Sequence, residues 1–145
     1  MKLLIQRVIN AEVKVDNKTI SEINQGLLVF LGIHNDDIET NIDFLIKKLT
    51  NLRIFEDEKG KMNLSIQDIK GSILLISQFT LHANCKRGNR PDFTQAANPE
   101  KAKQLYDLFI QKLKHTNIKV KSGIFGADMK VSLINDGPVT IILEI

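Results

Sequence analysis

The sequence predicts an α+β domain in which a largely antiparallel β-sheet, or a partly closed barrel, is covered by two helices. Predicted strands outnumber predicted helices, and short turns join most neighbouring strands. Short turns favour antiparallel pairs, because parallel neighbours need a long crossover connection. Two further segments carry apolar residues at helical spacing and supply helices to cover the sheet.

The predicted strands are alternating or apolar runs bounded by turn residues. Residues 1–15 largely alternate between apolar and polar positions, and residues 27–33 form an unbroken apolar run that is too short for a typical helix. We therefore predict a buried central strand at 27–33. The other predicted strands are residues 53–55, 62–64, 72–80, 118–121, 129–134 and 139–145, with a turn at 135–138.

Both predicted helices have an apolar stripe on one side. The first spans residues 38–51. Asp36 and Asp37 precede it, where acidic side chains can cap free N–H groups and favour the positive end of the helix dipole. The second begins with Asn98 as the N-cap and Pro99 in the first helical position, and it is expected to end near His115.

The composition is that of a folded globular protein. The chain has 145 residues, of which 43% are hydrophobic and 26% charged, and this length supports a core without a metal or disulfides. No repeat, linker or low-complexity segment divides the sequence. We therefore expect one domain over residues 1–145.

Nothing in the sequence predicts export or membrane insertion. Polar residues interrupt the first apolar positions too early for a signal-peptide core, and no apolar run approaches the roughly 18 residues of a membrane helix. The single cysteine, Cys85, cannot form an internal disulfide, which suits a reducing compartment. We expect a cytoplasmic protein without membrane contact.

No metal or cofactor is expected. The histidine, cysteine and acidic residues do not have the spacing of a metal site. Residues 123–126 (GIFG) lack the third glycine and the strand-to-helix context of a dinucleotide-binding loop.

The charge pattern indicates one candidate contact with a polyanion. The net charge of +3 and the isoelectric point of about 9.0 are compatible with a nucleic-acid partner but do not require one. Lys86, Arg87 and Arg90 gather around Gly88 in a predicted loop, residues 82–95. We call the segment that carries these three side chains the basic loop. It is a candidate phosphate contact, and a merely solvated loop is an equally compatible alternative.

Residues 77–81 (SQFTL) end an apolar strand with polar side chains, a common position for functional residues. The pattern alone favours an ordinary explanation, in which Thr80 is a β-branched strand residue and Ser77 a capping hydroxyl. His82 lies close to Thr80 along the chain, so a catalytic pair is geometrically possible but unspecific. Cys85 has no identifiable activating partner.

Four motifs occur in a fixed order along the chain. They are residues 77–81 (SQFTL), 90–93 (RPDF), 125–129 (FGADM) and 135–140 (NDGPVT). Together they closely resemble the D-aminoacyl-tRNA deacylase family of bacteria and eukaryotes, and the resemblance covers nearly the whole chain. That family usually has an aromatic residue at the position of His82 and no cysteine at that of Cys85, so neither is expected to be needed for its chemistry.

This resemblance implies an enzyme that hydrolyses the ester bond between a D-amino acid and the 3′ end of a tRNA and rejects L-aminoacyl substrates. It also implies a homodimer with sites at the subunit interface, in which a cis Gly137–Pro138 bond enters the partner's pocket. There the rigid proline would block an L side chain, while two main-chain carbonyls hold the α-amino group. Glycyl-tRNA, which has no side chain to exclude, would be hydrolysed as well.

The resemblance also implies roles for individual residues. The pocket floor would consist of Ser77, Gln78, Phe79 and Thr80. Main-chain N–H groups of Phe79 and Thr80 would stabilise the oxyanion, while Thr80 positions the ester for a water that the ribose hydroxyl of the tRNA assists. The terminal adenosine would lie near Phe125 and Met129, and the acceptor stem would contact Lys86, Arg87 and Arg90.

Alternatives from other classes remain open. A protein of this fold could bind tRNA or a D-amino acid without hydrolysis, which would keep the basic loop but would not need residues 77–80 and 137–138 together. A hydrolase of another small ester or peptide would use Thr80 and His82. Within the favoured hypothesis, Thr80 as a nucleophile lacks a dependable general base.

Overall fold

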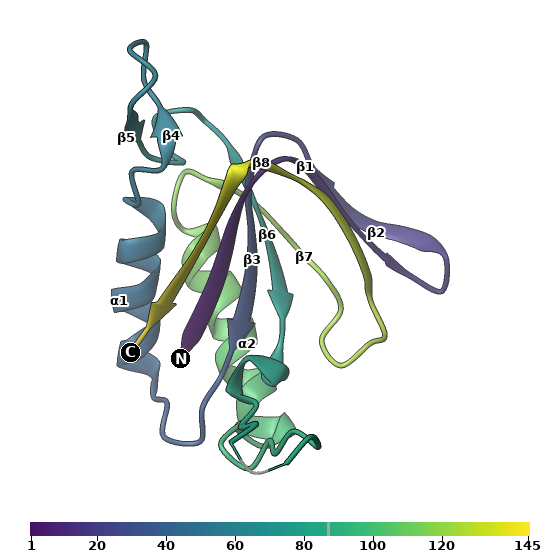
Figure 1. Ribbon diagram of the computed structural model, residues 1–145. Helices are drawn as coiled ribbons and strands as arrows, with labels where there is room; N and C mark the ends of the chain where they lie inside the picture. The colour runs from purple at the N-terminus through teal and green to yellow at the C-terminus, as the bar shows by residue number, and fades with distance from the viewer. Residues whose placement is uncertain (87) are drawn as a thin grey trace.

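The computed structural model describes residues 1–86 and 88–145 and confirms the predicted fold class. A curved sheet, partly closed into a barrel, has helices α1 (Glu39–Thr50) and α2 (Pro99–Lys114) packed on one face (Figure 1). Neither of these described helices is long and apolar enough to cross a membrane. Arg87, predicted to belong to the basic loop, lies outside the described residues.

Most of the predicted strands are present, one strand is added, and two predictions are corrected below. The main sheet contains β1 (Lys2–Val15), β2 (Lys18–Ile23), β3 (Gly26–Gly32), β6 (Ser72–Ser77), β7 (Lys119–Ser122) and β8 (Lys130–Glu144). A separate hairpin consists of β4 (Phe55–Glu56) and β5 (Met62–Leu64). Strand β2 was not predicted, because its sequence, KTISEI, is mostly polar and largely exposed, and it is a strand through its pairing with β1.

The main sheet is antiparallel around β1 and parallel beyond β3. Its order is β2-β1-β3-β6-β7, and β8 pairs with β1. Strand β1 runs antiparallel to β2, β3 and β8, whereas β3–β6 and β6–β7 are parallel pairs. Helix α1 lies in the connection from β3 to β6 and α2 in that from β6 to β7, so each parallel pair has the crossover that it needs.

Two apolar clusters fill the fold and explain the unbroken apolar run of β3. The larger cluster lies between sheet and helices and includes Leu27 of β3, Leu45 of α1 and Phe109 of α2. The smaller cluster includes Leu28 of β3 and Val13 of β1. Because consecutive strand residues point to opposite faces, β3 contributes to both clusters and has no solvent-facing side to make polar.

The predicted strand at 72–80 is too long and is corrected by the structure. Strand β6 ends at Ser77, and Phe79–His82 form a 3-10 helix, which we call η1. The N–H of Gln78 donates to the carbonyl oxygen of Leu31 (2.8 Å), close to the end of β3. Beyond that point β3 offers no further partner, so the chain leaves the sheet and winds into a turn.

The predicted turn at 135–138 is wrong, because β8 continues through these residues. Both halves of β8 pair with β1: Gln6 lies opposite Thr140, and Val8 lies opposite Asn135. Between these two pairs β8 advances by five residues while β1 advances by two, so three extra residues of β8 bulge out of the ladder. The polar and proline-containing segment interrupts the ladder without reversing the chain.

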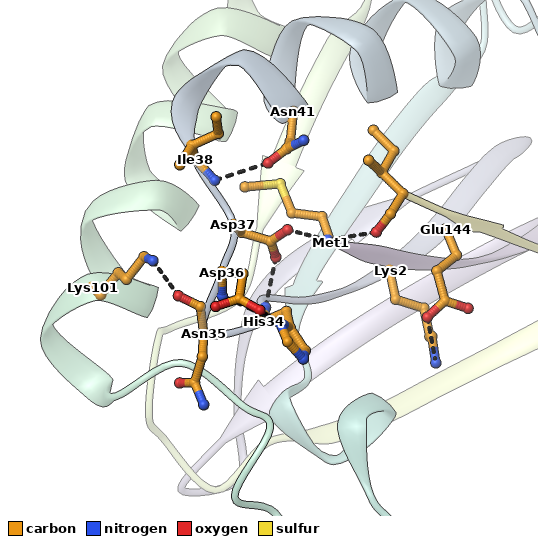
Figure 2. A network of polar contacts seen from close by, with 11 residues as sticks. Met1, Lys2, His34, Asn35, Asp36, Asp37, Ile38, Asn41, Lys101 and Glu144 are labelled. Atoms are coloured by element: carbon orange, nitrogen blue, oxygen red, sulfur yellow. Dashed lines mark hydrogen bonds and ion pairs between the residues drawn. The ribbon is translucent and has the colours of Figure 1, made fainter.

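The two helix starts differ in how their caps are used. At α2, the side chain of Asn98 accepts a hydrogen bond from the N–H of Lys101 (2.9 Å), as predicted. At α1, the predicted cap Asp37 instead accepts from the N–H of His34 (2.6 Å) and pairs with the amino group of Met1 (Figure 2). A charged amino group is the stronger partner for a buried carboxylate, which explains the difference.

Candidate active site

A cavity of about 590 Å³ opens where β3 and β6 end. Its walls are largely apolar and come from the ends of these strands, the start of α2 and residues 125–129. Its lining contains five of the predicted site residues, namely Ser77, Gln78, Phe79, Phe125 and Met129. Segments far apart in the sequence thus share one pocket large enough for a nucleoside.

The start of η1 presents polar groups beside this cavity. The side-chain amide of Gln78 donates to the hydroxyl of Thr80 (2.6 Å), which holds an exposed Thr80 in one orientation. The N–H groups of Phe79 and Thr80 find no acceptor among the described residues. The first N–H groups of a helix lack intrahelical partners, so these two can bind an oxygen of a ligand.

Aromatic side chains form two sides of the cavity. The ring of Phe93 packs edge-on against that of Phe79, with 5.0 Å between centroids, and this contact brings the predicted motif 90–93 to the site. On another side Phe125 packs against Tyr106 (5.6 Å between centroids). The buried hydroxyl of Tyr106 donates to the carbonyl oxygen of Leu75 (2.9 Å), and burial raises the pKa of this tyrosine, so it stays protonated.

Gly123 is a residue that the sequence analysis missed. A Cβ atom there would lie 2.5 Å from the sulfur of Met129 and 3.0 Å from the Cδ1 of Ile76. Met129 therefore occupies space that only a glycine leaves, and it reaches the cavity wall for that reason. A glycine between a strand and a predicted site motif was the available signal, but it was considered only as part of a dinucleotide loop.

The basic loop is closed at its base by its own main chain. Asn84 and Asp92 exchange two backbone hydrogen bonds, of 2.8 and 3.0 Å. Lys86 and Arg90 lie between them, and both side chains are exposed. Since Phe93 follows directly and packs on Phe79, these two cations sit on a segment that is anchored to the cavity wall.

The predicted gate, Gly137 and Pro138, is not part of the same chain's cavity. The peptide bond between them is cis, Gly137 has a φ of 134°, and both residues are exposed in the β8 bulge. The bulge lies at the level of β1 residue Arg7, which pairs with Leu27 of β3. The cavity begins near Leu31, which lies four residues beyond Leu27 on β3. At the rise of a strand, these two levels are roughly 13 Å apart.

Arg7 holds the bulge in place, and the sequence analysis missed this role. Its buried guanidinium donates from Nε to the carbonyl oxygen of Asp136 (2.9 Å) and from Nη1 to that of Ile54 (2.7 Å). A Cβ atom at Gly137 would lie 3.1 Å from Nη2. An arginine at an inward position of an apolar strand was the only sequence signal, and it does not identify a partner.

Asn135 fixes the other side of the bulge. Its side-chain oxygen accepts from the N–H of Val139 (2.7 Å), and its amide donates to the carbonyl oxygen of the same residue (3.1 Å). The bulge is therefore spanned by a side chain that imitates a strand partner. Together with Arg7, this contact keeps the exposed Pro138 at a defined place on the surface.

The catalytic pair of Thr80 and His82, which only the alternative hydrolase hypothesis requires, is not brought together. The imidazole of His82 is buried and lies against Gly32 and the ring of His34, whereas the Thr80 hydroxyl is bonded to Gln78. Cys85 is exposed and free. Among the described residues, no group of three His, Cys, Asp or Glu side chains is placed to hold a metal ion.

The model of the D-Tyr-tRNA(Tyr) deacylase family matches residues 4–144. The chain belongs to this family. A D-aminoacyl-tRNA deacylase of Finegoldia magna is 59% identical over 144 residues, which are 99% of this chain and 97% of that protein. One of Thermosipho melanesiensis is 54% identical over 145 residues, with the same shares of the two chains. The predicted family membership is thereby confirmed.

Solved structures show that the deacylase-family fold extends over the whole chain. A structure described as c-Myc DNA Unwinding Element Binding Protein superposes with a TM-score of 0.94 at 43% identity and covers 99% of this chain and 98% of that one. A probable eukaryotic D-amino acid tRNA deacylase superposes with a TM-score of 0.86 at 18% identity, with the same coverage, and supports the fold alone.

Replacing Arg7 by leucine is expected to lower the free energy of unfolding by about 2–4 kcal/mol, because the buried carbonyl group of Ile54 and the part-buried one of Asp136 lose their donor. Urea denaturation of the two proteins measures this difference. Lys47→Leu is the matched control: Lys47 is exposed, its side chain makes no hydrogen bond or ion pair among the described residues, and the change there should be within about 0.5 kcal/mol. Equal losses in the two variants would contradict the assigned role of Arg7.

Proposed function

We propose that this chain is a D-aminoacyl-tRNA deacylase that removes wrongly attached D-amino acids from tRNA before they reach translation. The family match over residues 4–144 carries this proposal, and a nucleoside-sized cavity beside two free N–H groups supports it. Water adds to the ester carbonyl, the bond to the ribose oxygen breaks, and free tRNA and the D-amino acid leave. Glycyl-tRNA is a second substrate.

Stabilisation of the oxyanion is the main catalytic contribution in this proposal. The N–H groups of Phe79 and Thr80 are adjacent, belong to a turn anchored at the sheet end, and bind the developing negative charge. Ser77 and Gln78 complete the floor, and the Gln78 amide keeps the Thr80 hydroxyl oriented toward the ester. Thr80 positions the ester, and the ribose hydroxyl of the tRNA assists the water.

The terminal adenosine occupies the apolar part of the cavity. Phe125, backed by Tyr106, offers a ring to the base, and Met129 offers a flexible apolar surface. The acceptor stem then follows the basic loop, where Lys86, Arg87 and Arg90 contact phosphates. Phosphate contacts orient the substrate without selecting a sequence, so many tRNAs are accepted.

Chirality is selected in a homodimer in which each chain's Pro138 enters its partner's cavity. The distance between the bulge and the cavity of one chain supports this, since Pro138 cannot act on its own pocket. Exposed apolar side chains on β1 and β8 supply a surface for self-association: Ile9, Ile134 and Ile142 are 53%, 52% and 59% exposed. The fixed proline ring excludes an L side chain and admits a D side chain or glycine.

We also propose that residues 1–145 act as one domain in the cytoplasm, where charged tRNA is used. The two apolar clusters share the same strands, which supports a single folding unit. Cys85, which is exposed and free, suits a reducing compartment.

Hydrolysis of D-tyrosyl-, glycyl- and L-tyrosyl-tRNA by the purified protein tests the proposed function. D-tyrosyl- and glycyl-tRNA should be hydrolysed, and L-tyrosyl-tRNA should be spared by at least about 100-fold, because exclusion by a rigid wall discriminates strongly. Equal rates on both tyrosyl enantiomers would refute the chiral gate. Binding of tRNA without hydrolysis would favour the binding-module alternative.

Thr80→Ala should reduce the deacylation rate only by about 3- to 10-fold, because the main-chain N–H groups remain and only a positioning contact is lost. Single-turnover kinetics on D-tyrosyl-tRNA measure the rate, and Thr40→Ala, at an exposed position of α1, is the matched control. Complete loss of activity together with an acyl group trapped on Thr80 of the unsubstituted protein would instead establish Thr80 as a nucleophile.

Replacing Lys86, Arg87 and Arg90 by alanine should weaken the binding of every tRNA alike and reduce the slope of log K against log salt by about 2. The affinities for several uncharged tRNAs between low and moderate salt measure both effects. The control removes three exposed lysines far from the site, Lys47, Lys48 and Lys59. If both triple variants bind tRNA equally well, the basic loop is merely solvated.

A further inference from the structure

His82 is a buried residue of η1, the same short helix that carries the proposed oxyanion-binding N–H groups. It is the last residue of η1 and only 7% exposed, and its Nε2 atom has no hydrogen-bond partner among the described residues. The same turn begins with Phe79 and Thr80. A buried histidine without a partner for one ring nitrogen is unusual, and the mechanism proposed above does not use it.

The imidazole is part of the contact that seats η1 on the sheet. A Cβ atom at Gly32 would lie 3.1 Å from the Cδ2 of His82 and 3.0 Å from the Cβ of Leu81, so this end of β3 touches η1 directly. The ring of His34 meets that of His82 edge-on, with centroids 5.4 Å apart. Lys2 donates from Nζ to the carbonyl oxygen of Leu81 (3.3 Å).

The surroundings favour a neutral His82. The amino group of Met1, at the start of the chain, and Lys2 of β1 face this region, and His34 faces it from the β3–α1 connection. Burial lowers the pKa of His82 most, and these three cationic or titratable groups lower it further, against a hydrogen bond with the Gly32 main chain that raises it.

The nearby carboxylates are engaged elsewhere. Asp37 pairs with the amino group of Met1, Glu144 with Lys2 (3.1 Å), and Asp36 lies 3.6 Å from the Nδ1 of His34 (Figure 2). Asp36 and Glu144 are also strongly exposed to solvent, which screens them. A protonated His82 would therefore be buried close to other cationic groups, and no free carboxylate among the described residues would compensate its charge.

We propose that His82 is a positioning residue whose neutral ring seats η1, and that its protonation in mild acid displaces the N–H groups of Phe79 and Thr80 and slows deacylation. The inference rests on the proposed function, because it assigns the pH response to the oxyanion-binding turn. Beyond the proposed function, the inference predicts that the activity falls in acid although no histidine takes part in the chemical step.

The direction of the pH effect follows from linkage. Because the folded-state pKa of His82 lies below the unfolded value of about 6.5, the unfolded chain binds more protons between the two values. The contribution of His82 to stability is present at neutral pH. It decreases as the pH falls below about 6.5 and levels off below the folded-state pKa.

Deacylation of D-tyrosyl-tRNA by His82→Phe and by the unsubstituted protein, at about pH 7.5 and at the His82 midpoint measured by the NMR titration described next, tests the proposal. Phenylalanine keeps a ring that cannot be charged, so the variant should stay within about 2-fold of the unsubstituted protein at the higher pH. At the lower pH, where half of the His82 rings carry a proton, the variant should keep about 2-fold more of its pH 7.5 rate than the unsubstituted protein keeps. His115→Phe, in which the replaced ring is exposed, should behave like the unsubstituted protein.

A titration of the unsubstituted protein by NMR gives a readout that needs neither a variant nor activity. The amide signals of Phe79 and Thr80 should shift with the midpoint of the His82 ring, and that midpoint should lie below the unfolded value of about 6.5. The proposal is overturned if these amides do not follow His82, or if His82→Phe loses activity in acid as the unsubstituted protein does. An inactive protein that passes the NMR test would refute the proposed function and leave the seating of η1 by His82 established.

Discussion

Strand β1 is the element on which both parts of the candidate site depend. Its residues pair with β3 and β2 along one edge and with β8 along the other, so it links the half of the sheet that ends in the cavity to the strand that carries the bulge. The register of these pairings sets the level of the bulge relative to the cavity. A shift by one residue would turn each side chain of β1 to the opposite face and place Arg7 away from the bulge.

The pairing of β1 also keeps the proposed stereochemical gate at Pro138 away from the cavity of the same chain. Within one chain, Pro138 and the cavity lie at different levels of the sheet, and Arg7 and Asn135 fix the bulge where it is. A fixed, exposed projection and an open pocket on the same molecule suit reciprocal exchange between two copies. In the proposed dimer, each copy therefore supplies a stereochemical barrier to the other, and neither has to move to do so.

In the proposed mechanism, the chemistry of the cavity depends on main-chain geometry more than on ionisable side chains. Its walls are mostly apolar, and the free donors beside it are N–H groups at the start of η1. Donors of this kind are fixed by backbone packing, so little energy is needed to reorient them when charge develops on a ligand. Under the proposed mechanism, the position of η1 matters more than the identity of any one polar side chain, and the buried contact of His82 with Gly32 and His34 helps to set that position.

The sequence by itself determined both helices, the Asn98 cap, most strands and the motifs that contain the site residues. These features depend on local periodicity or on short-range hydrogen bonds, which a segment carries with it. Only the tertiary structure decided that β6 stops at Ser77, that β8 bulges at Gly137 instead of turning, and that Arg7 reaches Asp136. These outcomes depend on where a neighbouring strand ends or continues, and a chain's local pattern reports how a segment is buried but not which distant segment lies beside it.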